Sequence, residues 1–360
     1  MTEGHFGIVN GLLTVGIPYK NVLSIDGLWA PPYVSSSFSL GVTVTGQAIA
    51  TQHYTWHPRF VERAGEVQGI GVRSVTMLIA GAHAGLMKMT LENKTAEHRE
   101  VSLAITTSGT LDRSESWEFG APQSQTATKP KTADGSLRLE QGGTAIVLRG
   151  GKEIRWEAAQ PHGRAAVSLP PSAQAAVYVA FAMGPMAEAE AECKKIAADP
   201  ERAMTAARSA YAERVREMFQ KLPRLKSDNP ALNRFYDRSL VHFLMNRWDV
   251  PEFTLHPYYS TGSVRGGCVC DYLWNFGECW EIFPLFDPAA SRAHIEKFLE
   301  VDMTRHFAFE PATGKAFGPW YMINQEKIVG MIYYHVKNTG DAQFLNEKVD
   351  GKTVLEHAIL

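Results

Sequence analysis

The first half of the chain alternates apolar and polar positions with the period of β-strands. Residues 38–45, 87–91 and 101–106 each place an apolar side chain at every second position. This period turns one face of a strand toward a core. The polar stretch at 92–97 predicts a hairpin that joins the second and third of these strands.

Further strand patterns follow up to about residue 185. Residues 137–139 and 145–148 form a second candidate pair, with Gly142 and Gly143 between them. Residues 176–181 are almost continuously apolar, which is typical of a strand covered on both faces. Residues 121–135 lack aliphatic side chains and predict an exposed loop. Many short strands with regular turn signals predict an antiparallel β-sandwich over residues 1–185.

The pattern changes to helical spacing from residue 186. Residues 187–198 and 200–222 are rich in strong helix formers, and Pro223 ends the second stretch. We therefore expect a helical linker over residues 186–227. The next segment opens with Asp228-Asn229-Pro230, which combines an Asx cap with a proline in the first helical turn.

The segment from 228 to 360 predicts a series of helices. After the helix that follows Pro230, we expect helices over about 271–286, 288–303 and 324–338, and another that starts near Thr353. The last helical pattern reaches Leu360 with no capping or breaking residue. We therefore expect the sequence to be part of a longer protein.

Composition and charge narrow the function classes. Hydrophobic residues make up 45% of the 360, and 36 Lys and Arg stand against 38 Asp and Glu, for a net charge of −2. This balance argues against a nucleic-acid partner. No window has the apolar length of a membrane span. Cys268 and Cys270 are spaced too closely for a usual zinc site, and no histidine pair has metal-ligand spacing, so we expect no metal and no cofactor.

Two stretches of the second half carry a family resemblance. The first is Asp-Tyr-Leu-Trp-Asn-Phe-Gly at 271–277, and the second runs from Gly-Pro-Trp at 318–320 to Thr-Gly-Asp at 339–341, followed by Phe344-Leu345. These stretches resemble the six-hairpin (α/α)6-toroid glycosidases, a group that includes processing α-glucosidase I, mannosylglycerate hydrolase and trehalase-like enzymes. The resemblance implies the first hairpins of such a toroid over residues 228–360. It also implies a glycoside hydrolase, or its N-terminal part, that cleaves an oligosaccharide.

The candidate catalytic residues are Asp271 and Glu278. In several of these families the Leu-Trp pair is followed by the general acid Asp, whereas this chain has Asn275, which cannot deliver a proton. Glycoside hydrolysis needs two carboxyl groups. On a helix, Asp271, Asn275 and Glu278 would share one face. In the alternative interpretation, Asp271 caps a helix and Glu278 is a solvated or paired surface residue.

The candidate substrate-binding residues surround this stretch. Aromatic faces stack on the C–H faces of sugars, although the helices of a toroid need large apolar side chains in any case. The selected residues are Arg265, Trp274, Asn275, Trp320, Tyr321 and Tyr258. A carbohydrate is the expected partner.

Other functions stay open. A phosphorylase or lyase on the same fold is a second enzyme interpretation. A non-catalytic carbohydrate-binding or scaffold protein is the alternative from another class, and Asn275 favours it. The sequence leaves the sugar, the oligomeric state and the localisation open.

Overall fold

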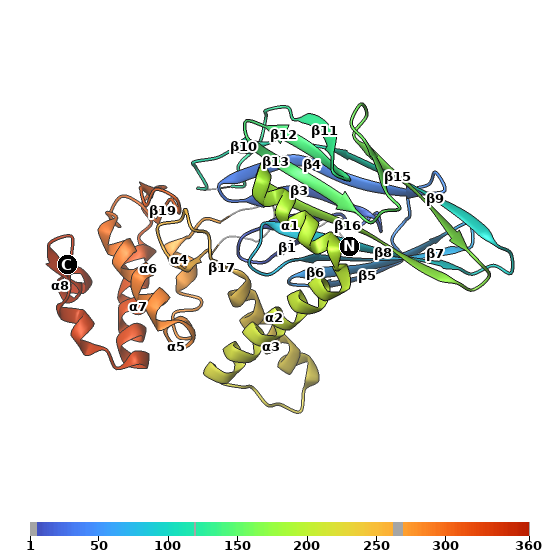
Figure 1. The fold of residues 1–360 in the computed structure, drawn as a ribbon. Helices are drawn as coiled ribbons and strands as arrows, with labels where there is room; N and C mark the ends of the chain where they lie inside the picture. The colour runs from blue at the N-terminus through green and yellow to red at the C-terminus, as the bar shows by residue number, and fades with distance from the viewer. Residues whose placement is uncertain (1–5, 119, 262–268, 360) are drawn as a thin grey trace. The chain divides into compact units, whose positions relative to one another are not determined.

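The computed structural model describes residues 6–118, 120–261 and 269–359, and Figure 1 shows its elements. Contacts divide these residues into two compact units. One unit contains residues 6–114 and 122–211, and the second contains Glu115–Ala121, without residue 119, together with 212–261 and 269–359. The division falls inside the helix α2 (Pro200–Lys221).

The first unit contains two antiparallel sheets of eight strands each. One has the order β1 (Phe6–Val9), β2 (Thr14–Ile17), β3 (Ser24–Ala30), β4 (Tyr33–Val44), β9 (Arg99–Ser108), β15 (His162–Leu169), β14 (Arg155–Glu157), with β10 (Asp112–Arg113) paired to β4. The other has the order β11 (Lys129–Ala133), β12 (Ser136–Gln141), β13 (Thr144–Gly150), β16 (Gln174–Pro185), β8 (Ala84–Asn93), β7 (Ile70–Leu78), β6 (Phe60–Val67), β5 (His53–His57). We call them the first and the second sheet.

One hydrophobic core fills the space between the two sheets. Val42 and Leu103 of the first sheet join Met87, Met89 and Val179 of the second in a single buried cluster. The members of each strand lie at alternate positions, as the sequence period requires. The predicted β-sandwich followed by helices is thus confirmed.

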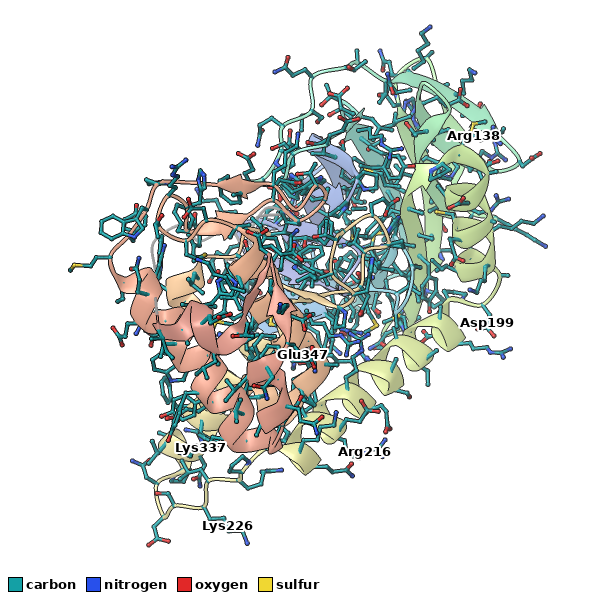
Figure 2. All side chains as sticks on the ribbon, turned by 90° about the vertical axis from the view of Figure 1, so that its left-hand side faces the viewer. Arg138, Asp199, Arg216, Lys226, Lys337 and Glu347 are labelled. Carbon is teal, nitrogen blue, oxygen red and sulfur yellow. The ribbon has the colours of Figure 1, made fainter. Side chains whose placement is uncertain are left out.

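Helix α1 (Met186–Ala198) covers the other face of the second sheet. Ala189, Cys193 and Ile196 of this helix are buried against strand residues such as Val147 and Ala180. The strand β16 is therefore covered on both faces, as its apolar run predicts. Arg138 of β12 forms an ion pair with Glu190 on the rim of this contact (Figure 2).

Two expectations for the first half are wrong. Residues 92–97 do not form a hairpin, because β8 belongs to the second sheet and β9 to the first. The fully buried Asn93 fixes this crossing, since its side-chain amide donates to the carbonyls of Glu97, Leu169 and Pro170 at 2.7, 2.9 and 3.1 Å. The expected loop at 121–135 contains the strand β11, which pairs along its whole length with β12.

The second unit is mainly helical. Its helices are the end of α2, α3 (Pro230–Met245), α4 (Leu273–Phe276), α5 (Phe283–Phe286), α6 (Pro288–Glu300), α7 (Ile323–Thr339) and α8 (Val354–Ile359), with a 3₁₀ turn η2 (Ala342–Asn346). Its two-stranded ribbons are β17 (Arg247–Trp248) with β18 (Tyr258–Tyr259), β19 (Ala308–Phe309) with β20 (Ala316–Phe317), and β21 (Lys348–Val349) with β22 (Lys352–Thr353). No helix in the described ranges is both long and apolar enough to cross a membrane.

Sequence signals set several of these helix ends. The side chain of Asn229 accepts hydrogen bonds from the amides of Ala231 and Leu232 at the start of α3, as the Asx cap predicts. Gly340 has a φ of 77° and ends α7 in the left-handed conformation. The expected continuous helix over 271–286 is wrong, because turns separate α4 from α5. Pro284 lies in the first turn of α5, where its missing N–H costs no helical hydrogen bond, so a new helix can begin there.

Candidate functional site

A cluster of aromatic rings gathers around Trp274 of α4. Its ring centroid lies 4.8 Å from that of Tyr272, 4.8 Å from that of Phe307 and 4.7 Å from that of Tyr321. Tyr272 precedes α4, Phe307 precedes β19, and Tyr321 lies just before α7. We call these four rings, together with Trp320 and Asn275, the aromatic surface.

Gly318 makes this close approach of rings possible. It has a φ of 77°, which favours glycine, and a Cβ at this position would lie 2.1 Å from a ring atom of Phe307. The backbone therefore turns directly over the Phe307 ring after β20. This turn leads the chain to Trp320 and Tyr321 beside the start of α7.

The aromatic surface has a solvent-exposed edge. Trp320 is 45% exposed and Tyr321 is 44% exposed, whereas Trp274 and Asn275 are half-buried. The tilted rings of Trp274 and Tyr321 meet edge to face at an interplanar angle of 74°. The edge thus combines flat apolar faces with an amide, which are groups that can contact both the C–H faces and the hydroxyls of a polyol.

Asp271 lies beneath this surface and is fully buried. One carboxyl oxygen accepts a hydrogen bond from the Phe309 amide at 3.4 Å. Burial raises the pKa of Asp271 well above the usual carboxyl range, and the hydrogen bond from the Phe309 amide partly opposes this rise. The neutral acid is therefore favoured, and none of its surface is exposed to solvent.

Asp271 and Glu278 do not share a helical face. Asp271 precedes α4, whose N-cap residue is Tyr272, and it forms no cap there, so the alternative capping role is also absent. Glu278 follows the end of α4 and is exposed. The reason is the short length of α4, which ends at Phe276 before a second turn could align the two carboxyls.

Two other sequence candidates are not part of the exposed edge. Tyr258 is fully buried, and its hydroxyl donates to the carbonyl of Val269 at 2.7 Å. Its ring packs edge to face against Phe253 and Phe309 in the interior of the unit. Arg265 falls within 262–268, outside the described residues.

A buried histidine supports the elements beneath the surface. The Nε2 atom of His294 accepts a hydrogen bond from the Tyr259 amide at 3.0 Å, so the proton of a neutral ring is on Nδ1, which lies 2.8 Å from the carbonyl of Ala290. Burial lowers the pKa of His294 from 6.5 to about 4. The neutral ring thus joins β18 to α6.

Sequence reasoning missed part of this arrangement. It did not select Tyr272 and Phe307, although the alternation Phe307-Ala308-Phe309 is a strand signal. It also missed Glu310, which is 2% exposed and accepts hydrogen bonds from the Trp117 amide at 3.0 Å and the Thr313 amide at 2.5 Å. Trp117 is nearly 200 positions earlier in the chain, and no local pattern points to that contact. The described residues contain no cluster of three or more His, Cys, Asp or Glu side chains that could hold a metal ion.

Solved structures share this fold. No family model matches the sequence, and no curated protein matches it. A human-microbiome protein provisionally assigned as a kojibiose phosphorylase is similar over 96% of this chain and 55% of its own, with a TM-score of 0.59 and 10% identity. A bacterial glucoamylase, solved in complex with acarbose, is similar over 92% of this chain and 55% of its own, with a TM-score of 0.62 and 9% identity.

The fold is that of the N-terminal half of these carbohydrate-active enzymes. The chain spans about 55% of the length of each of these two proteins. At 9% and 10% identity the similarity concerns the fold alone. It confirms the expected architecture of a β-sandwich followed by helices.

Proposed function

We propose that the chain supplies a sugar-binding portion of an enzyme that cleaves glycosidic bonds of an oligosaccharide. The observation that supports this most is the exposed edge of the aromatic surface, on a fold shared with a phosphorylase and a glucoamylase. The reaction class itself rests on the analogy of fold, which hosts more than one chemistry.

The proposed binding mode combines ring stacking with hydrogen bonds along the exposed edge. Trp320 and Tyr321 offer ring faces to the C–H face of a sugar, and the Tyr321 hydroxyl and the Asn275 amide offer hydrogen bonds to sugar hydroxyls. Trp274 holds Tyr321 in place through its edge-to-face contact. Substrate binding would thus be mainly apolar stacking with a few oriented polar groups.

The two candidate carboxyls receive different roles in this proposal. Glu278 is exposed and is free of any ion pair with the described residues, so it is the one that reaches a ligand and acts as acid or base. Asp271 is a positioning residue, because its carboxyl holds the Phe309 amide of β19 beneath the rings. The second carboxyl that hydrolysis requires is not assigned among the described residues.

The test measures cleavage of maltose and kojibiose by the protein with and without inorganic phosphate. We expect glucose release, and a phosphate requirement would assign phosphorolysis instead of hydrolysis. Trp320→Ala should raise KM about tenfold, since it removes a stacking face. Tyr333→Ala is the matched control, because Tyr333 is 56% exposed on α7 but outside the aromatic surface.

Glu278→Gln and Asp271→Asn separate the two carboxyls. Glu278→Gln should lower kcat by about a hundredfold or more with little change in KM. Asp271→Asn should preserve the pH profile of kcat, because a positioning residue transfers no proton. If Asp271→Asn instead abolishes turnover and shifts that profile, the roles proposed here are wrong.

A non-catalytic carbohydrate-binding protein is the second candidate. The burial of Asp271 favours it, because a general acid must reach the glycosidic oxygen. This candidate predicts sugar binding that Trp320→Ala weakens, with no turnover of either disaccharide. Turnover that Glu278→Gln abolishes would exclude it.

A further inference from the structure

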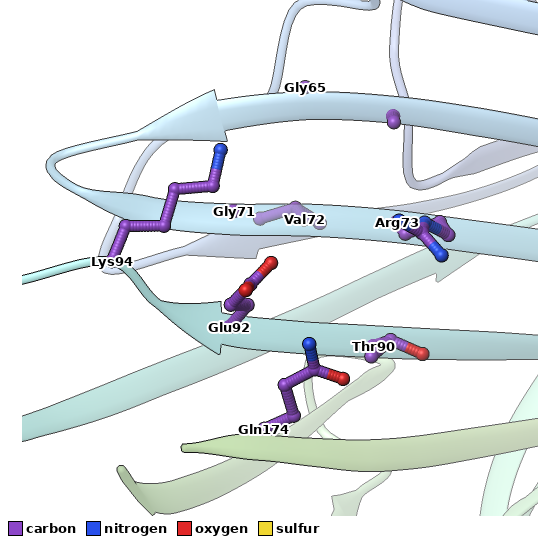
Figure 3. A pocket seen from close by; sticks show the side chains of 9 residues that line it. Gly65, Gly71, Val72, Arg73, Thr90, Glu92, Lys94 and Gln174 are labelled. Atoms are coloured by element: carbon purple, nitrogen blue, oxygen red, sulfur yellow. The ribbon is translucent and has the colours of Figure 1, made fainter. Parts of the chain in front are cut away.

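A polar hollow lies on the surface of the second sheet, within the first unit (Figure 3). It has a volume of about 90 Å³. Its lining comes from four neighbouring strands or their ends and consists of Ala64, Gly65, Gly71, Val72, Arg73, Thr90, Glu92, Lys94 and Gln174. Figure 3 shows Lys94 and Glu92 beside the strand that carries Gly71, and Gln174 on the far side of Glu92.

The strand register explains why the sheet is hollow here. Gly71 pairs with Glu92, and Glu92 pairs on its other side with Gln174. Glu66, Gly71, Glu92 and Gln174 therefore form one row across the strands. Because Gly71 has no side chain, this row has a gap between Glu66 and Glu92. Arg73 lies in the next row on the same face, between Ala64 and Thr90.

Two charged side chains of the hollow, Arg73 and Glu92, are available for a ligand. Lys94 forms an ion pair with Glu66 at 2.7 Å. Neither Arg73 nor Glu92 forms an ion pair with any residue that the structure describes. A guanidinium, a carboxylate and the amide of Gln174 therefore face one small space with donors and acceptors available.

We propose that this hollow binds one sugar residue of a neutral oligosaccharide. Planar groups such as guanidinium, carboxylate and amide can each hydrogen-bond two adjacent hydroxyls of a sugar ring. A volume of 90 Å³ is the space of about three liquid water molecules, so it takes one edge of a ring and its hydroxyls. The bound hydroxyls would replace waters that make the same bonds.

The charge of the lining selects a neutral ligand. Arg73 and Lys94 carry two positive charges, and Glu92 and the Lys94 partner Glu66 carry two negative ones. A phosphate or carboxylate ligand would meet the Glu92 carboxylate, and a cation would meet Arg73. The proposal is independent of the function proposed for the aromatic surface, because all lining residues belong to the first unit.

Gly71→Val fills the hollow without removing any of its polar groups. A Cβ at Gly71 would meet only the far ends of two flexible side chains, Lys94 at 2.8 Å and Glu92 at 3.5 Å. Valine also suits a strand. Gly41→Val is the matched control, because Gly41 lies in β4 of the first sheet and its Cβ would meet only the Thr106 hydroxyl, at 3.6 Å.

The experiment is saturation-transfer NMR with maltotriose, using the full chain that carries Trp320→Ala to weaken the aromatic surface. We expect a transfer signal that Gly71→Val and Arg73→Ala each reduce about tenfold and that Gly41→Val leaves unchanged. Inorganic phosphate should not compete. The proposal is overturned if maltotriose gives no signal, if Gly71→Val leaves the signal intact, or if phosphate displaces the sugar.

Discussion

The buried histidine beneath the aromatic surface makes a quantitative prediction about acid stability. His294 is fully buried and neutral, with one ring nitrogen accepting from the Tyr259 amide. Burial lowers its pKa from 6.5 to about 4. Below pH 6.5 the unfolded chain therefore binds a proton at this residue, whereas the folded chain does not. The free energy of unfolding consequently decreases as pH falls.

The magnitude follows from the two pKa values. A group with a pKa of 6.5 unfolded and about 4 folded reduces the free energy of unfolding by about 2 kcal/mol between pH 7 and pH 5, and by about 3 kcal/mol at pH 4. Asp287, which caps α6, lies near His294, and its charge partly opposes the lowered pKa. The value of about 4 already includes this effect, so the changes in the free energy of unfolding given above apply to the histidine with Asp287 present.

Two measurements check this prediction. The ring proton shifts of His294 in NMR spectra should stay constant from pH 7.5 to about pH 5. Urea unfolding at pH 7 and pH 5 compares the wild type with His294→Gln, which keeps an acceptor for the Tyr259 amide but does not titrate. The wild type should lose about 2 kcal/mol more than the variant over this range.

The reasoning would be refuted by a His294 resonance that titrates near pH 6.5. Equal losses of stability for the wild type and His294→Gln would also contradict it. The lowered pKa values of His57, His242 and His335 do not affect this comparison, because both proteins retain those residues.

Three further predictions concern buried or crowded positions. Because the pKa of Asp271 is raised, its cost to folding grows as pH rises above 3.8, so Asp271→Asn should gain stability relative to the wild type between pH 4 and pH 8 in urea unfolding; a constant difference would contradict this. Gly318→Ala should displace the Phe307 ring and weaken sugar binding in calorimetric titrations, whereas unchanged affinity would argue against the aromatic surface. Asn93→Ala should lower the free energy of unfolding by about 2–4 kcal/mol, because the carbonyls of Glu97, Leu169 and Pro170 lose a donor and the Leu169 bond is fully buried, and a loss below about 1 kcal/mol would contradict that account.

Periodic patterns in the sequence predicted the strands that pack one face regularly on a core. The alternation at 38–45 and the apolar run at 176–181 correspond to β4 and β16, because each strand packs a regular face on a core. The Asx cap at Asn229 and the glycine after α7 act within one turn, so they are visible in the local sequence.

Features that depend on distant contacts were not predictable in this way. The chain between β8 and β9 resembles a hairpin loop in sequence. In the structure, however, Asn93 donates hydrogen bonds to the carbonyls of Leu169 and Pro170, and the two strands belong to different sheets. The sequence pattern predicted one helix over about 271–286 that would carry both Asp271 and Glu278. In the structure α4 ends at Phe276, and the turns that follow it separate the two carboxyls.

The candidate site was predictable by residue type more than by geometry. Trp274, Trp320 and Tyr321 were selected because they lie beside loops and helix starts, and the structure brings Trp274 and Tyr321 into contact. Their partner Phe307 is more than 30 positions from Trp274 and carries no local signal of that contact. The exposure of each ring depends on the same tertiary contacts, so sequence alone did not separate Trp320 from the buried Tyr258.

The central claim is that a sugar binds on the exposed edge of the aromatic surface. Calorimetric titration with maltotriose tests it most directly, with the Gly71→Val chain as the parent so that the hollow on the second sheet is filled. The account predicts that Trp320→Ala weakens binding about tenfold and that Tyr333→Ala leaves it unchanged. Equal affinity in the Trp320→Ala protein, or an equal loss in the Tyr333→Ala protein, would contradict it.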